Sequence, residues 1–388
     1  MDKYPWINFT VNLQLLSYQT WIHLGECLSK CEHISKIPLK PSISAEIHKV
    51  YLAKGVWATT AIEGNTLTEE EVRLRIEKKL DLPPSREYLG QEIDSILQLC
   101  NEIMNNVANG KQPLIRIEEI CRYNKVILNK VPLREYVIPG EFRKYPVVVG
   151  SYKAVDHSDI PELMKRLCNW LDGPDFQIKG LPAIINSIIK ATIAHLYIAW
   201  IHPFGDGNGR TARILEFAIL ATSGVPFPAA QLLSNHYNAT RNEYYIQLDM
   251  ASKKNDTSGF LAYVIQGFRD GLVEQLKYIF QRVLDISWEN FVHDTFREHK
   301  HTEDTAKRRR TLAIELFRQP EPVAMDKLIT MSQKTIDLYQ NRSHMTLSRD
   351  LKDLIELDLI EKTDKGYRAK KEKMLIFLPV RAPLIDKK

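Results

Sequence analysis

The helical spacing of apolar residues is the feature that most limits what this 388-residue chain can fold into. Apolar side chains recur every three or four positions, which is the period of a helix with one buried face. This spacing predicts helices over 44–63, 86–107, 115–129, 159–172, 182–201, 209–223, 241–252, 257–285 and 287–300. Proline and glycine separate these segments. One segment, 140–152, has a β-branched run between glycines, as a hairpin would. The predicted fold class is therefore mainly α.

The composition is that of a globular protein. With 44% hydrophobic and 26% charged residues, the chain has enough apolar material for sizeable cores. No uninterrupted apolar run reaches the roughly 18 residues of a membrane span, so we expect no membrane association. The N-terminus carries an acid at Asp2 and lacks an apolar signal core, which favours a cytoplasmic location.

Several titratable residues lie on predicted helix faces. The five cysteines are scattered, which suits reduced thiols better than a disulfide framework. Cys27, Cys31 and His33 lie close together, but no second ligand pair with zinc-like spacing accompanies them. We therefore interpret them as one face of an N-terminal helix. His195, on the apolar segment 182–201, is expected to be packed and hydrogen-bonded rather than catalytic.

A change of pattern near residue 300 predicts a second domain. The charged stretch 300–310 is followed by two short helical segments, 310–319 and 324–330. Residues 343–369 then read as a capped helix, an apolar stop and a turn, which is the order of a winged helix. We expect an N-terminal helical region over 1–110, a core over 111–300 and a winged-helix domain over 305–388.

The stretch HPFGDGNGRTAR, residues 202–213, concentrates turn residues and anion-binding residues between two predicted helices. Gly205, Gly207 and Gly209 permit positive φ angles and a close approach of the backbone to a ligand. The loop runs directly into a helix N-terminus, whose unpaired N–H groups and dipole favour an anion. This pattern predicts a phosphate-binding loop.

The charged residues of the same stretch fit that prediction. Arg210 and Arg213 lie on one face of the first helical turns. Cations there oppose the helix dipole, which makes sense when a phosphate chain lies between them. Asp206 can hold Mg²⁺ against the same phosphates. His202, at the end of the preceding helix, can accept a proton from a hydroxyl.

Residues 202–213 match every defined position of the Fic motif, HxFx[D/E]GNGRxxR, and the chain resembles the Fic family over roughly residues 40–290. This resemblance implies an all-α fold and, usually, transfer of AMP from ATP to a hydroxyl of a target protein. The lysine that replaces the last motif glycine in the phosphotransferring Doc branch is absent, which favours nucleotidyl transfer.

The resemblance also implies a role for each motif residue. His202 would be the general base, Phe204 a buried anchor of the loop, and Asp206 the ligand of Mg²⁺. The other positions would bind ATP: Gly207, Asn208 and Gly209 as the anion hole, Arg210 on the phosphate chain and Arg213 on the γ-phosphate.

A second stretch, TTAIEGNTLT, resembles the inhibitory motif of the family, [S/T]xxxE[G/N], with Thr59, Glu63 and Gly64 in register. Gly64 and Asn65 also suit a helix C-cap. The resemblance implies that Glu63 pairs with Arg213 and denies it to the γ-phosphate. ATP would then bind unproductively until the helix moves.

Two further segments complete the resemblance. The hairpin at 140–150 would be the flap that holds a target segment by strand addition, with Val147 near the nucleotide. The stretch RNEYY resembles the lining of the adenine pocket, where Tyr244 or Tyr245 would stack or hydrogen-bond. Ser252 stands where the family often has an asparagine, which leaves the preference for ATP open.

The excess of positive charge lies in residues 297–388, where 21 Lys and Arg face 15 Asp and Glu, while the rest of the chain is about neutral. The C-terminal domain is therefore a candidate for contact with DNA or an acidic protein. Its recognition-like helix, 344–354, has Arg342, Arg349 and Lys352 available for phosphates. Acids on and after this helix argue against a strongly basic face: Asp350, Asp353, Glu356 and Asp358. DNA binding through 305–388 and protein binding therefore stay open alternatives.

Taken together, the sequence predicts a protein adenylyltransferase, restrained by Glu63, that uses ATP and Mg²⁺ to attach AMP to Ser, Thr or Tyr of a target or of itself. One alternative is the reverse enzyme, which removes AMP, with Glu63 positioning water and His202 protonating the leaving hydroxyl. The other is a DNA-binding regulator whose core senses nucleotide. A homo-oligomer is left open.

Overall fold

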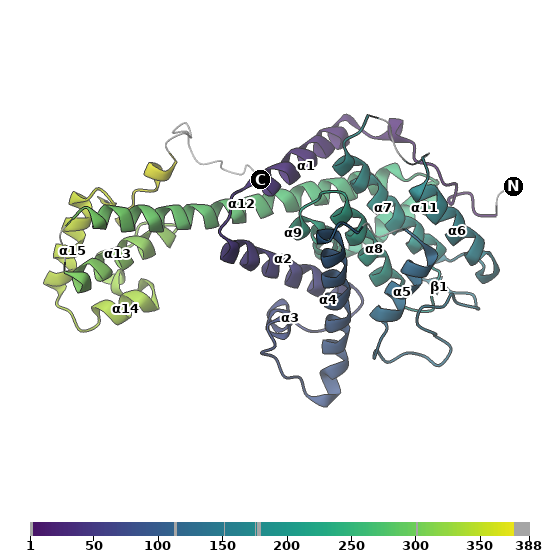
Figure 1. Ribbon diagram of the computed structural model, residues 1–388, viewed down its shortest axis with the longest axis horizontal. Helices are drawn as coiled ribbons and strands as arrows, with labels where there is room; N and C mark the ends of the chain where they lie inside the picture. The colour runs from purple at the N-terminus through teal and green to yellow at the C-terminus, as the bar shows by residue number, and fades with distance from the viewer. Residues whose placement is uncertain are drawn as a thin grey trace. The chain divides into compact units, whose positions relative to one another are not determined.

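The computed structural model describes residues 3–111, 115–150, 152–174, 176, 180–299 and 302–375 (Figure 1). Helices dominate these residues, which confirms the predicted fold class. The chain forms two compact units, Met1–Leu276 and Lys277–Lys388. The division between them falls inside a helix rather than in the charged stretch at 300–310.

In the N-terminal unit the predicted helices are present within a few residues of their expected ends, and other short helices are added between them. The bounds are α1 (Tyr18–Lys36), α2 (Pro41–Ile62), α3 (Glu69–Ile76), α4 (Glu87–Ala108), α5 (Ile117–Ile127), α6 (Ile160–Asp172), α7 (Ala183–Ile201), α8 (Asn208–Thr222), α9 (Phe227–Ala230), α10 (Leu232–Ala239) and α11 (Arg241–Lys254). Cys27 and Cys31 lie on the buried face of α1, as the helix-face interpretation expects. His33 is exposed, so it does not share that face.

Helix α7 is the centre of the N-terminal unit (Figure 1). Its own side chains are apolar and buried around nearly the whole helix, so α7 is a buried helix rather than an amphipathic one. By length and composition it could cross a membrane, but 78% of its most apolar stretch is buried inside the protein. Helix α8 packs against α7, α4 and α5, and α2 packs on α10. The loop between α7 and α8 therefore lies among several fixed helices.

The predicted hairpin over 140–152 is much shorter than expected. Strands β1 (Val148–Val149) and β2 (Tyr152–Lys153) form an antiparallel pair of two residues each. The segment before β1 joins the motif loop instead, because Phe142 forms an isolated bridge with Phe204. The sequence pattern did not reveal that these backbone groups bond to a distant part of the chain.

Helix α12 (Ser258–Arg297) is continuous, so the predicted division into 257–285 and 287–300 was wrong. The apolar pattern changes along this helix because its two ends belong to different cores. Phe260 is fully buried in the N-terminal unit, and Trp288 is fully buried in the C-terminal unit. The break in periodicity arises because the helix packs against one core in its first part and against another core in its last part. It does not mark an end of the helix.

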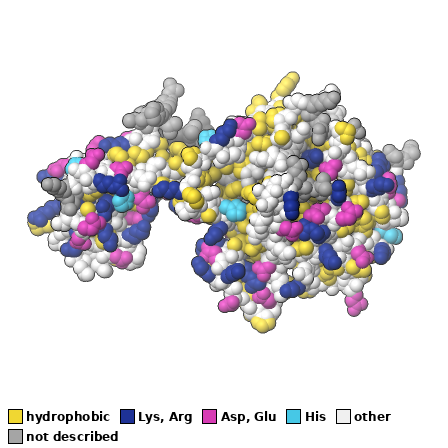
Figure 2. All heavy atoms as spheres, viewed as in Figure 1, with side chains coloured by type: hydrophobic (Ala, Val, Ile, Leu, Met, Phe, Trp, Pro, Cys, Tyr) yellow, Lys and Arg dark blue, Asp and Glu magenta, His cyan; other side chains and the backbone are white. Residues whose placement is uncertain are grey.

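After the end of α12, the described part of the C-terminal unit has three further α-helices and then a hairpin. They are α13 (Glu303–Arg318), α14 (Gln333–Tyr339), α15 (His344–Glu356), β3 (Ile360–Thr363) and β4 (Gly366–Ala369), and the strands are antiparallel. Helices followed by a hairpin is the order that the sequence predicts, but the second helix was misplaced. The predicted segment 324–330 forms two 3-10 turns, Met325–Lys327 and Ile329–Met331, and the helix begins only at Gln333. The assignment as a winged helix stays a prediction. On the face seen in Figure 2, basic and acidic side chains are interspersed.

Candidate active site

His202 ends α7 in a left-handed conformation. Its φ is 51°, and its N–H bonds to the Ile198 carbonyl at 2.9 Å, so the chain turns sharply before Pro203. Burial lowers the pKa of the imidazole to about 4, because a charged ring would lose its hydration. The ring is therefore neutral at neutral pH and can accept a proton.

The loop after His202 is cross-linked by its own side chains. The Asn208 amide accepts from the Phe204 N–H and donates to the Phe204 carbonyl, both at 2.9 Å. Gly207 has a φ of 74°, and a Cβ there would lie only 3.0 Å from the Asn124 amide nitrogen. Glycine is required at this position for both reasons. Helix α8 begins at the next residue, so the loop leads straight into a helix N-terminus.

Two buried residues that the sequence analysis missed hold this loop from outside. Asn124 of α5 donates to the Asp206 carbonyl at 2.9 Å. Arg143 donates to the His202 carbonyl at 2.8 Å and to the Val155 carbonyl at 2.6 Å. A polar residue on the apolar face of a helix was an available signal for Asn124. Arg143 lies in an irregular segment, where no pattern distinguishes it.

A cavity of about 500 Å³ opens beside His202. Its lining includes most of the predicted site residues: Glu63, His202, Asn208, Gly209, Arg213, Tyr244 and Tyr245. Val149 and Gly150 line it where the sequence analysis expected Val147. Six predicted site residues are not part of the lining: Thr59, Gly64, Val147, Asp206, Gly207 and Arg210. The structure thus assembles the predicted site from α2, the flap, the motif loop, α8 and α11.

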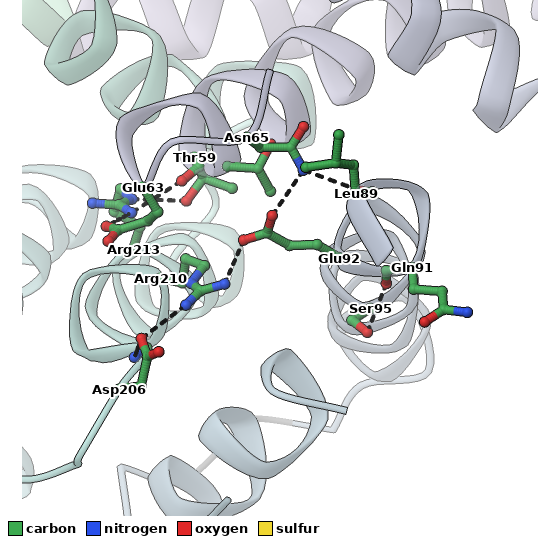
Figure 3. A network of polar contacts seen from close by, with 12 residues as sticks. Thr59, Glu63, Asn65, Leu89, Gln91, Glu92, Ser95, Asp206, Arg210 and Arg213 are labelled. Carbon is green, nitrogen blue, oxygen red and sulfur yellow. Dashed lines mark hydrogen bonds and ion pairs between the residues drawn. The ribbon is translucent and has the colours of Figure 1, made fainter. Parts of the chain in front are cut away.

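Arg213 is held by the predicted inhibitory motif (Figure 3). Its guanidinium donates to the Thr59 hydroxyl at 2.7 Å, to the Thr59 carbonyl at 3.0 Å and to Glu63 Oε1 at 2.5 Å. Burial opposes ionisation of Glu63, but the charges of Arg213 and Arg210 outweigh it and lower the pKa of this carboxyl. The contact is therefore a charged ion pair at neutral pH. A Cβ at Gly209 would collide with Glu63.

The end of α2 has the predicted C-cap. Gly64 has a φ of 99°, and the Asn65 N–H bonds to the Thr60 carbonyl at 3.1 Å, as in a Schellman motif. Arg241 of α11 donates to the Ile62 carbonyl. A cation at a helix C-terminus is favourable, because it satisfies a terminal carbonyl and complements the dipole. These contacts fix Glu63 at the cavity.

Arg210 has partners that the sequence analysis did not predict. It forms ion pairs with Glu92 of α4 and with Asp206, the latter at 3.0 Å between Nη2 and Oδ1. Glu92 in turn accepts a hydrogen bond from Asn65 at 2.7 Å (Figure 3). Arg210 is therefore held between two carboxylates and lies outside the cavity lining. Its contact with the phosphate chain stays a prediction.

The tyrosines of α11 have different surroundings. Tyr244 is buried, and its hydroxyl lies 2.8 Å from Nε2 of His195. This confirms that His195 is packed and hydrogen-bonded. Tyr245 is 46% exposed at the cavity. Ser252 is buried, and its hydroxyl donates to the Asp249 carbonyl at 2.9 Å. Asp249 lines the cavity, and Ser252 does not.

Asp206 fits a magnesium ion that it shares with phosphates. Its side chain is 46% exposed, and its Oδ1 accepts the Gly207 N–H at 2.5 Å. The described residues contain no group of three His, Cys, Asp or Glu side chains that could hold a metal. Mg²⁺ is commonly bound by one or two carboxylates together with substrate phosphates. Asp206 suits that arrangement, in which the substrate phosphates supply further ligands of the ion. The described residues around Asp206 do not form a cation site from protein side chains alone.

The first residues of α8, Asn208 and Gly209, line the same cavity as His202. A helix N-terminus of this kind can bind a phosphate group, here next to a neutral base. Residues 114–220 match the Fic/DOC family model. This part of the chain is therefore a Fic domain.

Curated relatives carry the name protein adenylyltransferase. The chain is 31% identical over 214 residues to protein adenylyltransferase fic-1 of Caenorhabditis elegans, covering 54% of this chain and 38% of the relative. It is 30% identical over 215 residues to protein adenylyltransferase Fic of Nematostella vectensis, covering 54% of this chain and 45% of the relative. The chain thus spans less than half the length of these relatives.

Solved structures share the fold. A Fic family protein from Desulfovibrio desulfuricans G20 aligns with a TM-score of 0.55 at 20% identity, over 93% of this chain and 97% of that chain. Fic-1 of C. elegans aligns with a TM-score of 0.55 at 23% identity, over 68% of this chain and 74% of that chain.

Proposed function

We propose that this protein transfers AMP from ATP to a hydroxyl group of a protein target. The observation that carries the proposal is the shared cavity, which brings the neutral imidazole of His202 together with Asn208, Gly209 and Arg213. The names of the curated relatives support the same activity. We infer ATP as the nucleotide, with Tyr244 and Tyr245 beside its base.

In the proposed reaction His202 accepts the proton of the target hydroxyl as its oxygen bonds to the α-phosphorus. The bond between the α-phosphorus and the bridging oxygen breaks, and pyrophosphate leaves with the electron pair. Backbone N–H groups at the start of α8 stabilise the phosphate oxygens, as oriented dipoles do in an enclosed site. Mg²⁺, held by Asp206 and the phosphates, would neutralise charge on the leaving group.

We infer that Glu63 restrains this activity. Arg213 is the cavity-lining arginine of the motif, and Glu63 and Thr59 already occupy its guanidinium. The γ-phosphate would have to displace a charged partner to reach it. The Glu63 side chain is 28% exposed, so it lies at the accessible side of this buried arginine. A movement of the α2 end would release Arg213.

The target segment is proposed to lie along the flap, residues 140–150. Val148 and Val149 of β1 are 65% and 43% exposed. Among the residues that the structure describes, β1 pairs with one strand, β2. An extended peptide can add to such an edge, where main-chain hydrogen bonds provide affinity. Val149 also lines the cavity, so a peptide bound there would run close to His202.

Incorporation of label from ATP carrying a labelled α-phosphate tests the proposal. The variants are wild type, Glu63→Gly and Glu63→Gly/His202→Ala, each incubated with Mg²⁺ and a bacterial lysate. We expect label to rise with Glu63→Gly and to disappear with His202→Ala. Glu77→Gly is the matched control, because Glu77 is the C-cap of the neighbouring helix α3 and does not line the cavity.

The result that would overturn the proposal is an absence of label with every variant. Loss of AMP from a pre-labelled target, abolished by Glu63→Gly, would favour the reverse enzyme. A DNA complex that depends on residues 305–388, without labelled product, would favour the regulator.

A further inference from the structure

Arg210 is a buried cation between two carboxylates of different exposure. Its side chain is 6% exposed, that of Glu92 is 9% exposed, and that of Asp206 is 46% exposed. Glu92 binds Nη1 and Asp206 binds Nη2. One carboxylate is therefore fixed inside the protein, and the other reaches solvent beside the motif loop.

The two oxygens of Asp206 have different surroundings. Oδ1 accepts the Gly207 N–H at 2.5 Å and Arg210 Nη2 at 3.0 Å. Within the described part of the chain, every hydrogen bond and ion pair of this carboxylate is made by Oδ1, and none is made by Oδ2. Asp206 is thus oriented through one oxygen, and the other is left for a cation. Oxygen donors of this kind are the ligands that Mg²⁺ prefers.

Glu92 is itself held in place. Its Oε2 accepts the Asn65 amide at 2.7 Å, and the same amide donates to the Leu89 carbonyl at 3.1 Å. Asn65 directly follows the C-cap of α2. Figure 3 shows the resulting chain of contacts from Asn65 through Glu92 and Arg210 to Asp206. The end of the helix that carries Glu63 is therefore connected to Asp206 by a route that does not pass through Arg213.

The charges indicate what Glu92 does. A guanidinium presents a planar fork of donors that matches both oxygens of a carboxylate. Without the charge of Glu92, Arg210 would have Asp206 as its one remaining carboxylate partner and would gain by binding both of its oxygens. A divalent cation would then compete with a buried arginine for Oδ2. The Glu92 carboxylate prevents this competition, because it binds the other side of the guanidinium.

We propose that Glu92 is a positioning residue, which keeps Asp206 Oδ2 available for a nucleotide-bound divalent cation by holding Arg210. Asn65 supports it by fixing the second oxygen of Glu92. The inference rests on the proposed function in one respect, since the cation is taken to arrive with the phosphates of a nucleotide.

Calorimetric binding of α,β-methylene-ATP tests the inference without turnover. Binding is measured in the Glu63→Gly background with Mg²⁺ and with EDTA, and the ratio of the two dissociation constants is the gain due to the metal. We expect Glu92→Gln to reduce this gain about fivefold to tenfold and to leave binding in EDTA within about twofold, as for pairwise couplings between neighbouring charges.

Asp94→Asn is the matched control. Asp94 lies two residues from Glu92 on α4, and its partner Arg75 also has a second carboxylate, Glu87. The variant removes one of the two carboxylate partners of Arg75, which is not part of the motif loop. We expect the metal-dependent gain to be unchanged. An equal loss for Asp94→Asn would overturn the inference, because it would indicate a general weakening of α4.

A double-mutant cycle separates positioning from a loss of structure. In an Arg210→Gln background, Glu92→Gln should have no further effect on the metal-dependent gain, because the competing guanidinium is gone. A full additional loss there, or an equal loss of binding in EDTA, would overturn the inference. If Glu92→Gln does not fold, Asn65→Ala provides the test, with a loss of about twofold expected in the same direction.

The outcome is independent of the transfer reaction. Suppose that no variant gives labelled product, but Glu92→Gln reduces the metal-dependent gain in affinity as expected. The proposed function would then be refuted, and this inference would stand. If labelled product is formed but Glu92→Gln leaves the metal-dependent gain unchanged, the proposed function would stand and this inference would be refuted.

Discussion

The two units each contain a buried cluster of arginines and carboxylates, and the clusters differ in how completely they are closed. In the C-terminal unit, Asp350 accepts from Arg308 at 2.6 Å, from Arg309 at 2.7 Å and from the Tyr339 hydroxyl at 2.9 Å. Asp350 is 1% exposed. Burial opposes its ionisation, but the bonds from Arg308 and the other donors outweigh it and lower its pKa.

In the N-terminal unit the equivalent carboxylate is Glu63, which borders a cavity. It has one charged partner within hydrogen-bond distance, Arg213, and its side chain is 28% exposed. A carboxylate surrounded by donors can be removed only with loss of structure. A carboxylate at the edge of a cavity can separate from its arginine when a stronger anion arrives. The contrast is consistent with our proposal that Glu63 restrains the site, whereas the Asp350 cluster maintains the fold.

Asp350→Ala should have the largest effect, because it leaves two buried guanidinium groups without their shared acceptor. Breaking a buried pair in this way costs about 3–5 kcal/mol. Hydrogen exchange should show faster opening of α13 and α15, with α7 unchanged. Asp337→Ala is the control, since Asp337 is an exposed acid of α14 that accepts one bond, from Gln333. Equal effects of the two variants would remove the contrast.

Thr59→Val should have a smaller effect, on activity rather than stability. It removes the hydroxyl that accepts from Arg213 Nε and leaves Glu63 in place. One such bond contributes about 1 kcal/mol, so we expect AMP transfer to rise about fivefold, less than with Glu63→Gly. Thr60→Val is the control, because the Thr60 hydroxyl bonds to carbonyls of α2 itself. Activation by the control variant would contradict the assignment.

Arg349→Ala tests whether the C-terminal unit binds DNA. Of the three cations that the sequence analysis singled out, Arg342 pairs with Asp304 at 3.0 Å and Lys352 with Glu356 at 3.7 Å. Asp350, expected there as a surface acid, is buried instead. We expect Arg349→Ala to change the retention of duplex DNA by less than about threefold at physiological salt. A tenfold loss with a shallower salt dependence would establish a DNA-binding face.

The pH dependence should be the smallest effect near neutrality. The pKa of His202 is lowered to about 4, so the neutral imidazole is present above this value and is lost as the pH falls through it. The pKa of Glu63 is also lowered, so its contact with Arg213 persists above the ordinary carboxyl range and weakens only in acid. Transfer by Glu63→Gly between pH 6 and 8 should show no histidine transition, and a step of about tenfold near pH 6.5 would contradict this.

The sequence predicted the features that depend on neighbouring residues. The periods of α7 and α8 and the glycines between them predicted a buried helix, a tight loop and a helix N-terminus. Gly64 and Asn65 predicted a helix C-cap. In each case the interacting groups lie within a few residues of one another, so local geometry alone fixes the outcome.

Tertiary structure decided which distant groups meet. Glu92 and Arg210 are 118 residues apart, and Asn124 and Asp206 are 82 residues apart. Nothing in the spacing of either pair indicates a contact, because the packing of α4 and α5 on α8 brings them together. The same applies to α12, whose two ends enter different cores. The sequence by itself determined the chemical groups of the site. The packing of helices determined which of those groups line the cavity and which are held away from it. The physical reason is that a buried charge needs a partner, and the fold decides which partner is within reach.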